Sequence, residues 1–254
     1  TTVKSKEKID KNIRHGSYPN YYGEKFRYQD SRSQHFQEIL DQYKDEVCPK
    51  DESNSGRKDF YFLDVGCNSG KLTSAMHSVF GSASGLRVRG LGVDIDKDLI
   101  AKAIETHGSK LEFAVADISA IAQGKATENP IVDYLKRNSI QRFDVVFCFS
   151  TLMYIHLENG EVGLQAVLDY MCSVTNVLGL ELHANGKYRN QAKKMRRYGG
   201  DKSYDHKKLE WITPDVKVEQ KIKDYLASKG FRVVCDHEKK NERKRNIVIF
   251  SKTS

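Results

Sequence analysis

The stretch that decides the fold is Phe60-Tyr-Phe-Leu-Asp-Val-Gly-Cys-Asn-Ser-Gly70, a hydrophobic run that leads into a glycine turn and then into a helical pattern. Gly66 and Gly70 permit positive φ and a close approach of the backbone to a ligand, and a helix start offers N–H groups to it. A cofactor site is therefore predicted at this turn. Dinucleotide sites use the pattern G-x-G-x-x-G, and Asn68 replaces the middle glycine, so a ligand without a pyrophosphate fits better.

Acidic residues follow the next two predicted strands. Asp94 ends the second strand, where an acidic residue commonly binds the two hydroxyls of a ribose. The spacing from Gly66 to Asp94 exceeds the usual ~20 residues, and an insertion at 81–85 accounts for the excess. The third strand leads into Asp117 and Ile118, where a carboxylate could accept a hydrogen bond from an adenine amino group. The predicted cofactor-binding residues are Asp64, Gly66, Cys67, Asn68, Gly70, Asp94, Asp117, Ile118 and Ser150.

Short β-branched runs alternate with helical patterns along the chain, which is typical of a parallel sheet covered by helices. Strands are predicted at 60–65, 88–93, 111–115, 143–149, 177–182, 231–235 and 247–251. Helices are predicted at 31–47, 71–80, 97–106, 131–138, 161–175, 188–198 and 216–229. Surface loops are expected at 81–85 and 120–129. The predicted fold class is α/β, a Rossmann-like, mostly parallel seven-stranded sheet with helices on both faces.

Composition excludes several classes of protein. Of the 254 residues, 39% are hydrophobic and 30% charged, which does not fit wholesale disorder or collagen-like repetition. The longest apolar stretch, 145–155, is shorter than the ~20 residues that cross a bilayer, and residues 1–12 show no signal peptide. Five cysteines without CxxC spacing disfavour disulfides and zinc, and indicate a reducing compartment. The net charge of +8 indicates an acidic partner.

Four residues at successive strand ends resemble, in their order, the class I S-adenosylmethionine-dependent methyltransferases: Asp64, Gly66, Asp94 and Asp117. The alternatives are another Rossmann-like nucleotide binder, or an aspartate that only caps a helix. In a methyltransferase, residues 151–160 would lie beside the reactive methyl group. Because this segment has no Asn-Pro-Pro-Tyr type element and Cys148 is placed like a core residue, methylation of a nucleic acid base is disfavoured.

A more specific resemblance is carried by several stretches in order along the chain: Gly16-Ser-Tyr-Pro-Asn-Tyr-Tyr-Gly23, Leu63-Asp-Val-Gly-Cys-Asn-Ser-Gly70, Gly92-Val-Asp-Ile-Asp96, and Ile155-His-Leu157 followed by Gly160 and Gly163-Leu164. They resemble the bicoid-interacting family of RNA 5′-phosphate methyltransferases, or methylphosphate capping enzyme family. That family includes a small nuclear RNA γ-phosphate capping enzyme and an enzyme that methylates the 5′-monophosphates of transfer RNA and precursor microRNA.

The resemblance implies transfer of a methyl group from S-adenosylmethionine to a terminal phosphate oxygen of a small noncoding RNA. Residues 66–70 match the family's cofactor turn, and Asp94 matches its ribose carboxylate. The family's phosphate-binding arginine aligns with Lys25, which neutralises phosphate as a point charge but lacks the bidentate fork of arginine. Arg27 is close enough to substitute. The residues predicted to act at the phosphate are Tyr21, Lys25, Arg27 and Arg189.

A terminal phosphate oxygen is already anionic, so its attack on the sulfonium methyl requires alignment and proximity and no strong general base. The three cations just named are expected to bind the non-reacting phosphate oxygens, while the Tyr21 hydroxyl orients the phosphate. Tyr18, Tyr21 and Tyr22 could stack on the first nucleotide. The alternative for these tyrosines is an aromatic cluster that pins the N-terminal arm to the core.

The residues after the fifth strand depart from the family pattern. Where the family carries Glu-Pro-Gln-Pro-Trp, this chain reads Glu181-Leu-His-Ala-Asn-Gly186 and keeps only the glutamate in register. The following stretch, 187–199, resembles the monophosphate-type enzyme more than the γ-phosphate type. The missing residues favour a rival hypothesis, a catalytically weak or inactive RNA-binding or scaffold subunit of a small ribonucleoprotein. The intact cofactor turn favours the enzyme.

Positive charge is concentrated between Lys187 and Lys208, where nine Lys and Arg stand against two Asp, a net of +7. A dense positive face of this kind suits a phosphate backbone, and a solvated helix is the alternative. The predicted RNA-binding residues outside the arm are His156, Lys187, Lys193, Lys194, Arg196 and Arg197. For His156, a loop histidine with a local hydrogen bond is the alternative. The basic residues at 239–245 are expected in a hairpin loop, as a solvated turn or an RNA contact.

The family resemblance also implies organisation and partners. Residues 1–30 are predicted to form a substrate-binding arm, and residues 31–254 a methyltransferase domain with a basic insertion near 184–215. The expected partners are a small noncoding RNA with a 5′ phosphate and a La-related protein, with no metal and no membrane. A nuclear location is expected, with a cytoplasmic one as the alternative. Monophosphate and triphosphate ends both remain open at this stage.

Overall fold

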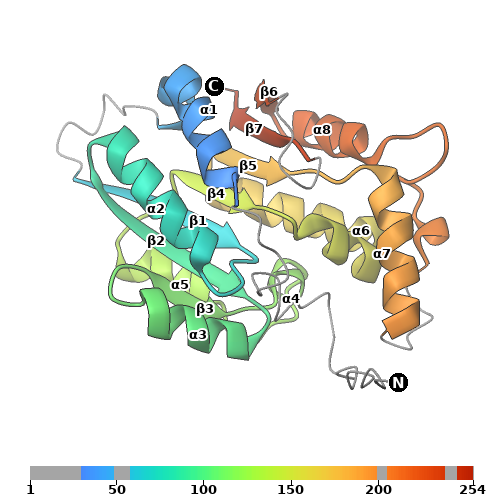
Figure 1. Ribbon diagram of the computed structural model, residues 1–254, viewed down its shortest axis with the longest axis horizontal. Helices are drawn as coiled ribbons and strands as arrows, with labels where there is room; N and C mark the ends of the chain where they lie inside the picture. Colours follow the sequence, from blue (N-terminus) through green and yellow to red (C-terminus); the bar gives the residue numbers. More distant parts are fainter. Residues whose placement is uncertain (1–29, 49–57, 199–204, 238–244, 254) are drawn as a thin grey trace, which may run out of the picture.

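The computed structural model describes residues 30–48, 58–198, 205–237 and 245–253, without the side chains of 194, 195, 197 and 198. Seven strands form one sheet in the order β3-β2-β1-β4-β5-β7-β6 (Figure 1). Their bounds are β1 Asp59–Val65, β2 Arg87–Asp94, β3 Glu112–Val115, β4 Val145–Cys148, β5 Val177–Glu181, β6 Phe231–Asp236 and β7 Ile247–Lys252. Strands β1 to β5 pair with one another in parallel, whereas β7 is antiparallel to both β5 and β6. The predicted seven-stranded, mostly parallel sheet is confirmed.

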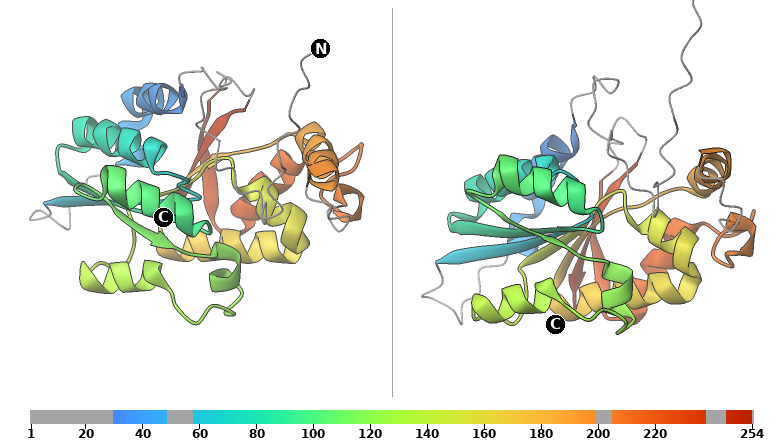
Figure 2. Two further views of the ribbon diagram at one scale, coloured as in Figure 1. Left: turned by 60° about the horizontal axis from the view of Figure 1, so that its bottom comes forward. Right: turned by 90° about the horizontal axis from the view of Figure 1, so that it is seen from below.

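Helices cover both faces of the sheet (Figure 2). One face carries α1 Arg32–Val47, α2 Lys71–Ser84 and α3 Lys97–His107, and the other carries α4 Ile118–Ala122, α5 Pro130–Arg137, α6 Leu152–Val174 and α8 Val218–Ser228. At one end of the molecule, α7 Asn185–Tyr198 packs beside the short 3₁₀-helix η2 His206–Lys208. None of these described helices is long and apolar enough to cross a membrane.

Strand β1 shows why the sheet is buried on both faces. Phe60 and Phe62 point into the core under α1 and α2, whereas Tyr61 and Leu63 point into the core under α5 and α6. All four side chains are at most 7% exposed. A central parallel strand therefore needs a continuous hydrophobic run rather than an alternating one, as this sequence has.

Two predicted loops are partly helical. Residues 81–84 continue α2, so the long spacing between Gly66 and Asp94 comes from an extra helical turn that ends at Gly85 in the left-handed region. Residues 118–122 form α4. The largest difference is at α6, where an additional helical segment from Leu152 precedes the helix predicted at 161–175. Gly160 is non-helical, with φ 64° and ψ −168°, so the two segments meet at a kink there.

Candidate functional site

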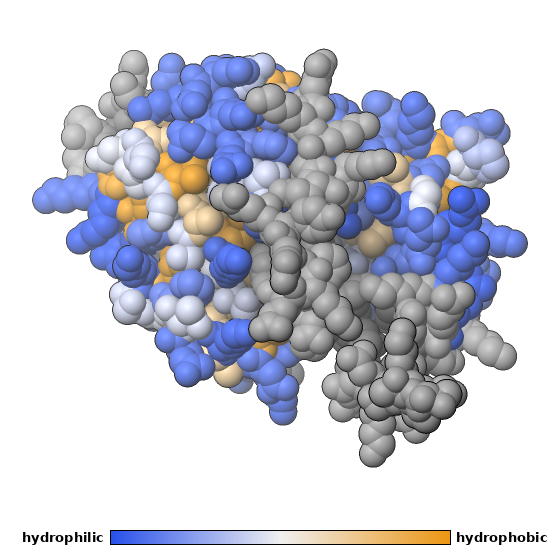
Figure 3. Space-filling view, in the orientation of Figure 1, coloured by the Kyte–Doolittle hydropathy of each residue, from blue (hydrophilic) through white to orange (hydrophobic). Residues whose placement is uncertain are grey.

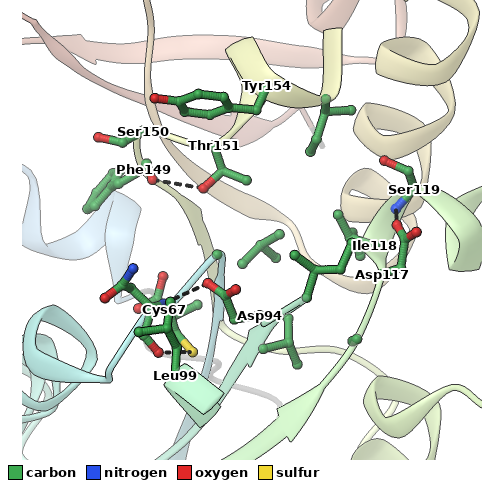
Figure 4. A pocket seen from close by; sticks show the side chains of 18 of the residues that line it. Cys67, Asp94, Leu99, Asp117, Ile118, Ser119, Phe149, Ser150, Thr151 and Tyr154 are labelled. Atoms are coloured by element: carbon green, nitrogen blue, oxygen red, sulfur yellow. Dashed lines mark hydrogen bonds between the residues drawn. The ribbon is translucent and has the colours of Figure 1, made fainter. Parts of the chain in front are cut away.

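A pocket lies where the carboxyl ends of β1, β2 and β4 meet α6 (Figure 4). In open α/β sheets ligands bind outside the carboxyl ends of the strands, near the point where strand order reverses. Here that point lies between β1 and β4. Eight of the nine predicted cofactor residues line the pocket: Asp64, Gly66, Cys67, Asn68, Asp94, Asp117, Ile118 and Ser150.

The turn after β1 is fastened to the end of β2. The backbone N–H groups of Gly66 and Cys67 both donate to the carbonyl oxygen of Val93, at 2.8 and 3.0 Å. Gly66 has φ +82°, and a Cβ atom there would come within 2.1 Å of the Thr151 hydroxyl. The site therefore requires glycine at this position, both for backbone conformation and for space.

Gly70, the ninth predicted cofactor residue, does not line the pocket. It precedes α2 with φ +74°, and a Cβ atom there would lie 2.8 Å from the Phe113 ring and 3.2 Å from Ala103. Gly70 therefore lets the start of α2 pack closely against β3 and α3. Its contribution to the site is through the shape of the turn.

Asp94 lies beside the turn with its carboxylate held by two backbone groups. Oδ2 accepts from the N–H of Asn68 at 2.8 Å, and Oδ1 accepts from the N–H of Asp96 at 3.0 Å. Burial raises the pKa of Asp94, while these two hydrogen bonds oppose the rise. A carboxylate oriented in this way suits a pair of hydroxyl donors, because each oxygen can accept more than one hydrogen bond.

Asp117 both caps a helix and lines the pocket. Its Oδ1 accepts from the backbone N–H groups of Ser119 and Ala120, at 2.9 and 3.1 Å, which is the N-cap of α4. The cap fixes the side chain at the pocket wall. Ile118 adds apolar surface beside it, and Leu99 lines the pocket on the side of Cys67 (Figure 4). A flat heterocycle with an exocyclic amino group fits between an apolar wall and such an acceptor.

Asp64 lies at the end of β1, 4% exposed. Its Oδ2 accepts a hydrogen bond from the Thr73 hydroxyl at 2.6 Å. Burial raises the pKa of Asp64 to about 6, although the Thr73 hydrogen bond and the charge of Arg32 oppose this rise. An acidic group that is costly to ionise and faces a pocket is a candidate functional residue.

One face of α6 forms the far wall of the pocket. Residues 151–160 were expected beside the methyl group of a methyltransferase, but none of the residues of this face was predicted to bind the cofactor. This face consists of Thr151, Tyr154, Ile155, Glu158 and Asn159. Their spacing of i, i+3, i+4, i+7 and i+8 is the pattern of one helical face, so periodicity could have revealed it. Figure 4 shows Tyr154 and Thr151 across the cavity from Asp94.

A buried cluster of charges adjoins the pocket and was also missed. Arg32 lines the pocket at 5% exposed, and its Nε and Nη2 donate to the two carboxylate oxygens of Asp30 at 2.8 and 2.6 Å. Its Nη1 lies 3.9 Å from Glu181 Oε2, and Arg245 Nη1 lies 3.3 Å from the same oxygen. The Ser150 hydroxyl donates to Glu181 and accepts from Arg245 at 2.6 Å.

His156 lies inside the protein, which corrects its predicted loop position and its predicted contact with RNA. It is on α6 with 0% exposure. Its Nε2 is 3.1 Å from Glu161 Oε1, and its Nδ1 is 3.2 Å from the Tyr188 hydroxyl. The same Glu161 oxygen accepts from the Trp211 N–H at 3.0 Å. The network joins α6 to α7 and to the segment before α8.

The basic helix α7 presents cations to solvent. Arg189, Lys193 and Arg196 are exposed and Lys187 is half-buried, whereas the side chains of Lys194 and Arg197 are outside the described part of the chain. In Figure 3 the right side of the molecule, which α7 occupies in Figure 1, is mostly hydrophilic. Arg189 is not among the residues that line the pocket.

The remaining predicted residues of the N-terminal arm and the last loop are not described by the structure. Tyr18, Tyr21, Tyr22, Lys25 and Arg27, and residues 239–244, fall outside the described ranges. All five cysteines are free. Among the described residues, no group of three or more His, Cys, Asp and Glu is arranged to hold a metal ion.

Comparison with known families confirms the predicted resemblance. Residues 143–252 match the family model described as Bicoid-interacting protein 3 (Bin3). This match covers β4, α6, β5 and the basic helix α7, and it includes the far wall of the pocket. The glycine turn and Asp94 lie before the matched segment.

Curated relatives point in the same direction. A pre-miRNA 5′-monophosphate methyltransferase of Xenopus laevis is 32% identical over 161 residues, covering 61% of this chain and 62% of that protein. An RNA 5′-monophosphate methyltransferase of Mus musculus is 31% identical over 185 residues, 68% of this chain and 62% of that protein. The chain therefore spans about three fifths of the length of these relatives.

Solved structures support the fold. The crystal structure of DszA carbon methyltransferase superposes with a TM-score of 0.55 at 16% identity, covering 89% of this chain and 55% of that one. The architecture is therefore that of class I methyltransferases, as predicted.

Proposed function

We propose that this chain, which carries the Bin3 domain over residues 143–252, is an S-adenosylmethionine-dependent RNA 5′-phosphate methyltransferase acting on 5′-monophosphate ends. One observation carries the proposal. The ends of β1 to β4 and the α6 face close around a single pocket whose polar groups match the parts of that cofactor. The relatives named for RNA 5′-monophosphate supply the substrate class.

Several features of the pocket support S-adenosylmethionine as the cofactor. Asp94 offers a fixed carboxylate for the two ribose hydroxyls, beside a glycine turn where a Cβ would not fit. Leu99 and Ile118 offer apolar faces to the adenine, with the Asp117 carboxylate at its edge. A dinucleotide would require space for a pyrophosphate where Asn68 stands, so a mononucleoside cofactor fits better.

The amino-acid end of the cofactor is assigned to the opposite end of the pocket. Arg32 is the only Lys or Arg among the described residues lining the pocket. A guanidinium that is largely buried interacts more strongly with a carboxylate than an exposed one, because the local dielectric is lower. We therefore assign the cofactor carboxylate to the part of the pocket that Arg32 and Ser150 line.

The cofactor supplies an electrophilic methyl group, and the chain supplies position. A phosphate oxygen is anionic without the help of a base, so the residues around it need only align it and exclude competing geometries. Tyr154 and Thr151 lie on the α6 wall, across the cavity from Asp94 (Figure 4). Tyr21, Lys25, Arg27 and Arg189 remain the proposed contacts of the non-reacting phosphate oxygens.

The RNA strand is assigned to the surface of α7. Arg189, Lys193 and Arg196 are exposed on it, and Lys207 lies on η2, which packs against α7. These cations have no acidic partner at salt-bridge distance among the described residues, whereas Arg87 and Arg137 elsewhere do. Such cations can neutralise phosphates without first breaking an internal ion pair.

The experiment that tests this function is mass spectrometry of RNA 5′ ends. A 5′-monophosphate RNA incubated with the purified chain and S-adenosylmethionine should gain the mass of one methyl group on its terminal nucleotide. Cofactor and RNA that both bind while the terminal mass stays unchanged would favour the scaffold hypothesis. A La-related partner and a nuclear location stay predictions from the family resemblance.

A further inference from the structure

Glu181 is the only acidic residue of the described strands that is completely shielded from solvent. It ends β5, one strand away from the pocket, and is not itself a lining residue. Burying an isolated carboxylate is very unfavourable, so its presence requires cationic and hydrogen-bonding partners. Among the described residues, its partners include Arg32, Arg245 and the Ser150 hydroxyl. Two of the three, Arg32 and Ser150, do line the pocket.

The contacts of Arg32 hold its side chain from two directions. Asp30 binds the Nε and Nη2 side of the guanidinium in a bidentate pair, while Nη1 faces Ser150 at 3.5 Å and Glu181 at 3.9 Å. A planar fork bound on two edges has little freedom to rotate. The position of the guanidinium therefore depends on a carboxylate behind the pocket wall.

Arg245 has a complementary effect. It lies just before β7 with its side chain 11% exposed, and its Nη1 approaches both Glu181 and Ser150. Because Glu181 is shared between two guanidiniums, its charge does not act on Arg32 alone. Counted over the described residues alone, two cations, Arg32 and Arg245, face two anions, Asp30 and Glu181, so Arg32 can be oriented without a net negative charge among these four residues. A net negative cluster would repel an incoming carboxylate.

Ser150 shows that the local backbone is arranged for this cluster. It has φ 61°, in the left-handed region that a residue with a side chain adopts only at a conformational cost. In this conformation its hydroxyl donates to Glu181 and accepts from Arg245. The strained residue thus connects the hidden carboxylate to the pocket surface.

We propose that Glu181 and Arg245 are positioning residues that hold the Arg32 guanidinium and the Ser150 hydroxyl in place for the amino-acid end of the cofactor. The inference rests on the proposed function, because it requires an S-adenosyl ligand in the pocket. Neither residue is assigned a contact with the ligand. Substituting either residue should therefore lower the affinity only for ligands that carry the amino-acid end, and only while Arg32 is present.

The test compares two ligands that share the adenosine part. S-adenosylhomocysteine carries the amino-acid end, and 5′-methylthioadenosine lacks it. By calorimetry, Glu181→Gln should weaken S-adenosylhomocysteine by about tenfold and leave 5′-methylthioadenosine within about twofold, the size expected when one hydrogen bond to a charged group is removed. Arg245→Gln should act in the same direction more weakly. Arg137→Gln, which removes the exposed pair with Glu112, is the matched control and should change neither affinity.

A double-mutant cycle separates positioning from general damage. If Glu181 acts through Arg32, then Glu181→Gln should have little further effect on S-adenosylhomocysteine once Arg32→Gln is present. Circular dichroism and thermal unfolding identify variants that do not fold, and Arg245→Gln then takes the place of Glu181→Gln. Equal weakening of both ligands, weakening of neither, or full additivity with Arg32→Gln would overturn the inference. A wild-type chain that binds neither ligand would instead contradict the proposed function.

Discussion

The backbone N–H of Asn68 donates to Oδ2 of Asp94 across 2.8 Å, so the turn after β1 and the end of β2 share one hydrogen bond at the pocket. Asn68 itself has φ 52°, and its side-chain oxygen accepts from the N–H of Ser69 at 2.8 Å. Asp94 therefore fixes the turn as well as offering its carboxylate to the pocket. A change at Asp94 should affect both functions.

Asp94→Asn should weaken S-adenosylmethionine binding by ~2 to 3 kcal/mol, because an amide lacks one of the two acceptor oxygens and the negative charge. Calorimetric titration of the purified variant measures this directly. Asp96→Asn is the control, since Asp96 caps α3 and asparagine caps a helix equally well. Unchanged cofactor affinity in Asp94→Asn would remove Asp94 from the site.

The basic face of α7 predicts a specific salt dependence. Lys193→Gln with Arg196→Gln should weaken RNA binding and reduce the slope of log K against log salt by ~0.7 for each single-strand phosphate that the variant no longer neutralises. Lys102→Gln with Lys136→Gln removes the same charge from exposed positions on α3 and α5. If both double variants change the slope equally, RNA responds to net charge and not to α7.

Asp64 predicts a pH effect on folding. Its pKa is raised from 3.8 to about 6, so between these values the unfolded chain releases a proton that the folded chain retains. Folding stability contributed by this group is therefore lost as pH rises through that window, by up to about 3 kcal/mol. Asp64→Asn lacks this titration, and its amide oxygen can still accept from Thr73.

Urea unfolding of wild type and Asp64→Asn at pH 4 and pH 7 measures the effect. The variant should gain stability relative to wild type at the higher pH. A stability difference that is the same at both pH values would show that Asp64 ionises normally in the folded chain.

His156 predicts an effect on stability and no direct effect on RNA binding. His156→Ala removes a hydrogen-bond partner from the Tyr188 hydroxyl and from Glu161 and opens a cavity, so the free energy of unfolding should fall by about 3 kcal/mol. Chemical denaturation measures it. At a temperature where the variant is fully folded, the salt slope of RNA binding should be that of wild type. A reduced slope would instead indicate that His156 contributes to RNA binding.

The bounds of the central strands could be predicted closely, because these strands are hydrophobic on both faces and pack against a core on each side of the sheet. Phe60 to Val65 has no polar residue except Asp64, and the structure buries every side chain of the run. Helix ends were harder to predict. Gly160 does interrupt the helix, with φ 64° and ψ −168°, but a helical segment from Leu152 precedes it, and Leu157 of that segment is buried in the same core as Leu164.

The cofactor turn, Asp94 and Asp117 could be located from sequence because they follow strands directly. Arg32, Glu181 and Arg245 could not, because they come from α1, β5 and the start of β7 and meet only after folding. Local rules even argue against Arg32, since a cation in the first turn of a helix opposes the helix dipole. Asp30 and Glu181 offset that cost. Asp30 precedes the helix and Glu181 lies on β5, so neither pairs with Arg32 at the i, i+3 or i, i+4 spacing that a sequence pattern would show.

The most direct measurement of the central claim is transfer of tritium from labelled S-adenosylmethionine to two RNAs of one sequence, one ending in a 5′ monophosphate and the other in a 5′ hydroxyl. Filter binding on the same samples reports how tightly each RNA is held. The proposed function predicts label on the phosphorylated RNA alone, with similar binding of both, because the exposed cations Lys193 and Arg196 of α7 contact the strand in either RNA. Equal labelling of the two RNAs, or tight binding with no label on either, would contradict it.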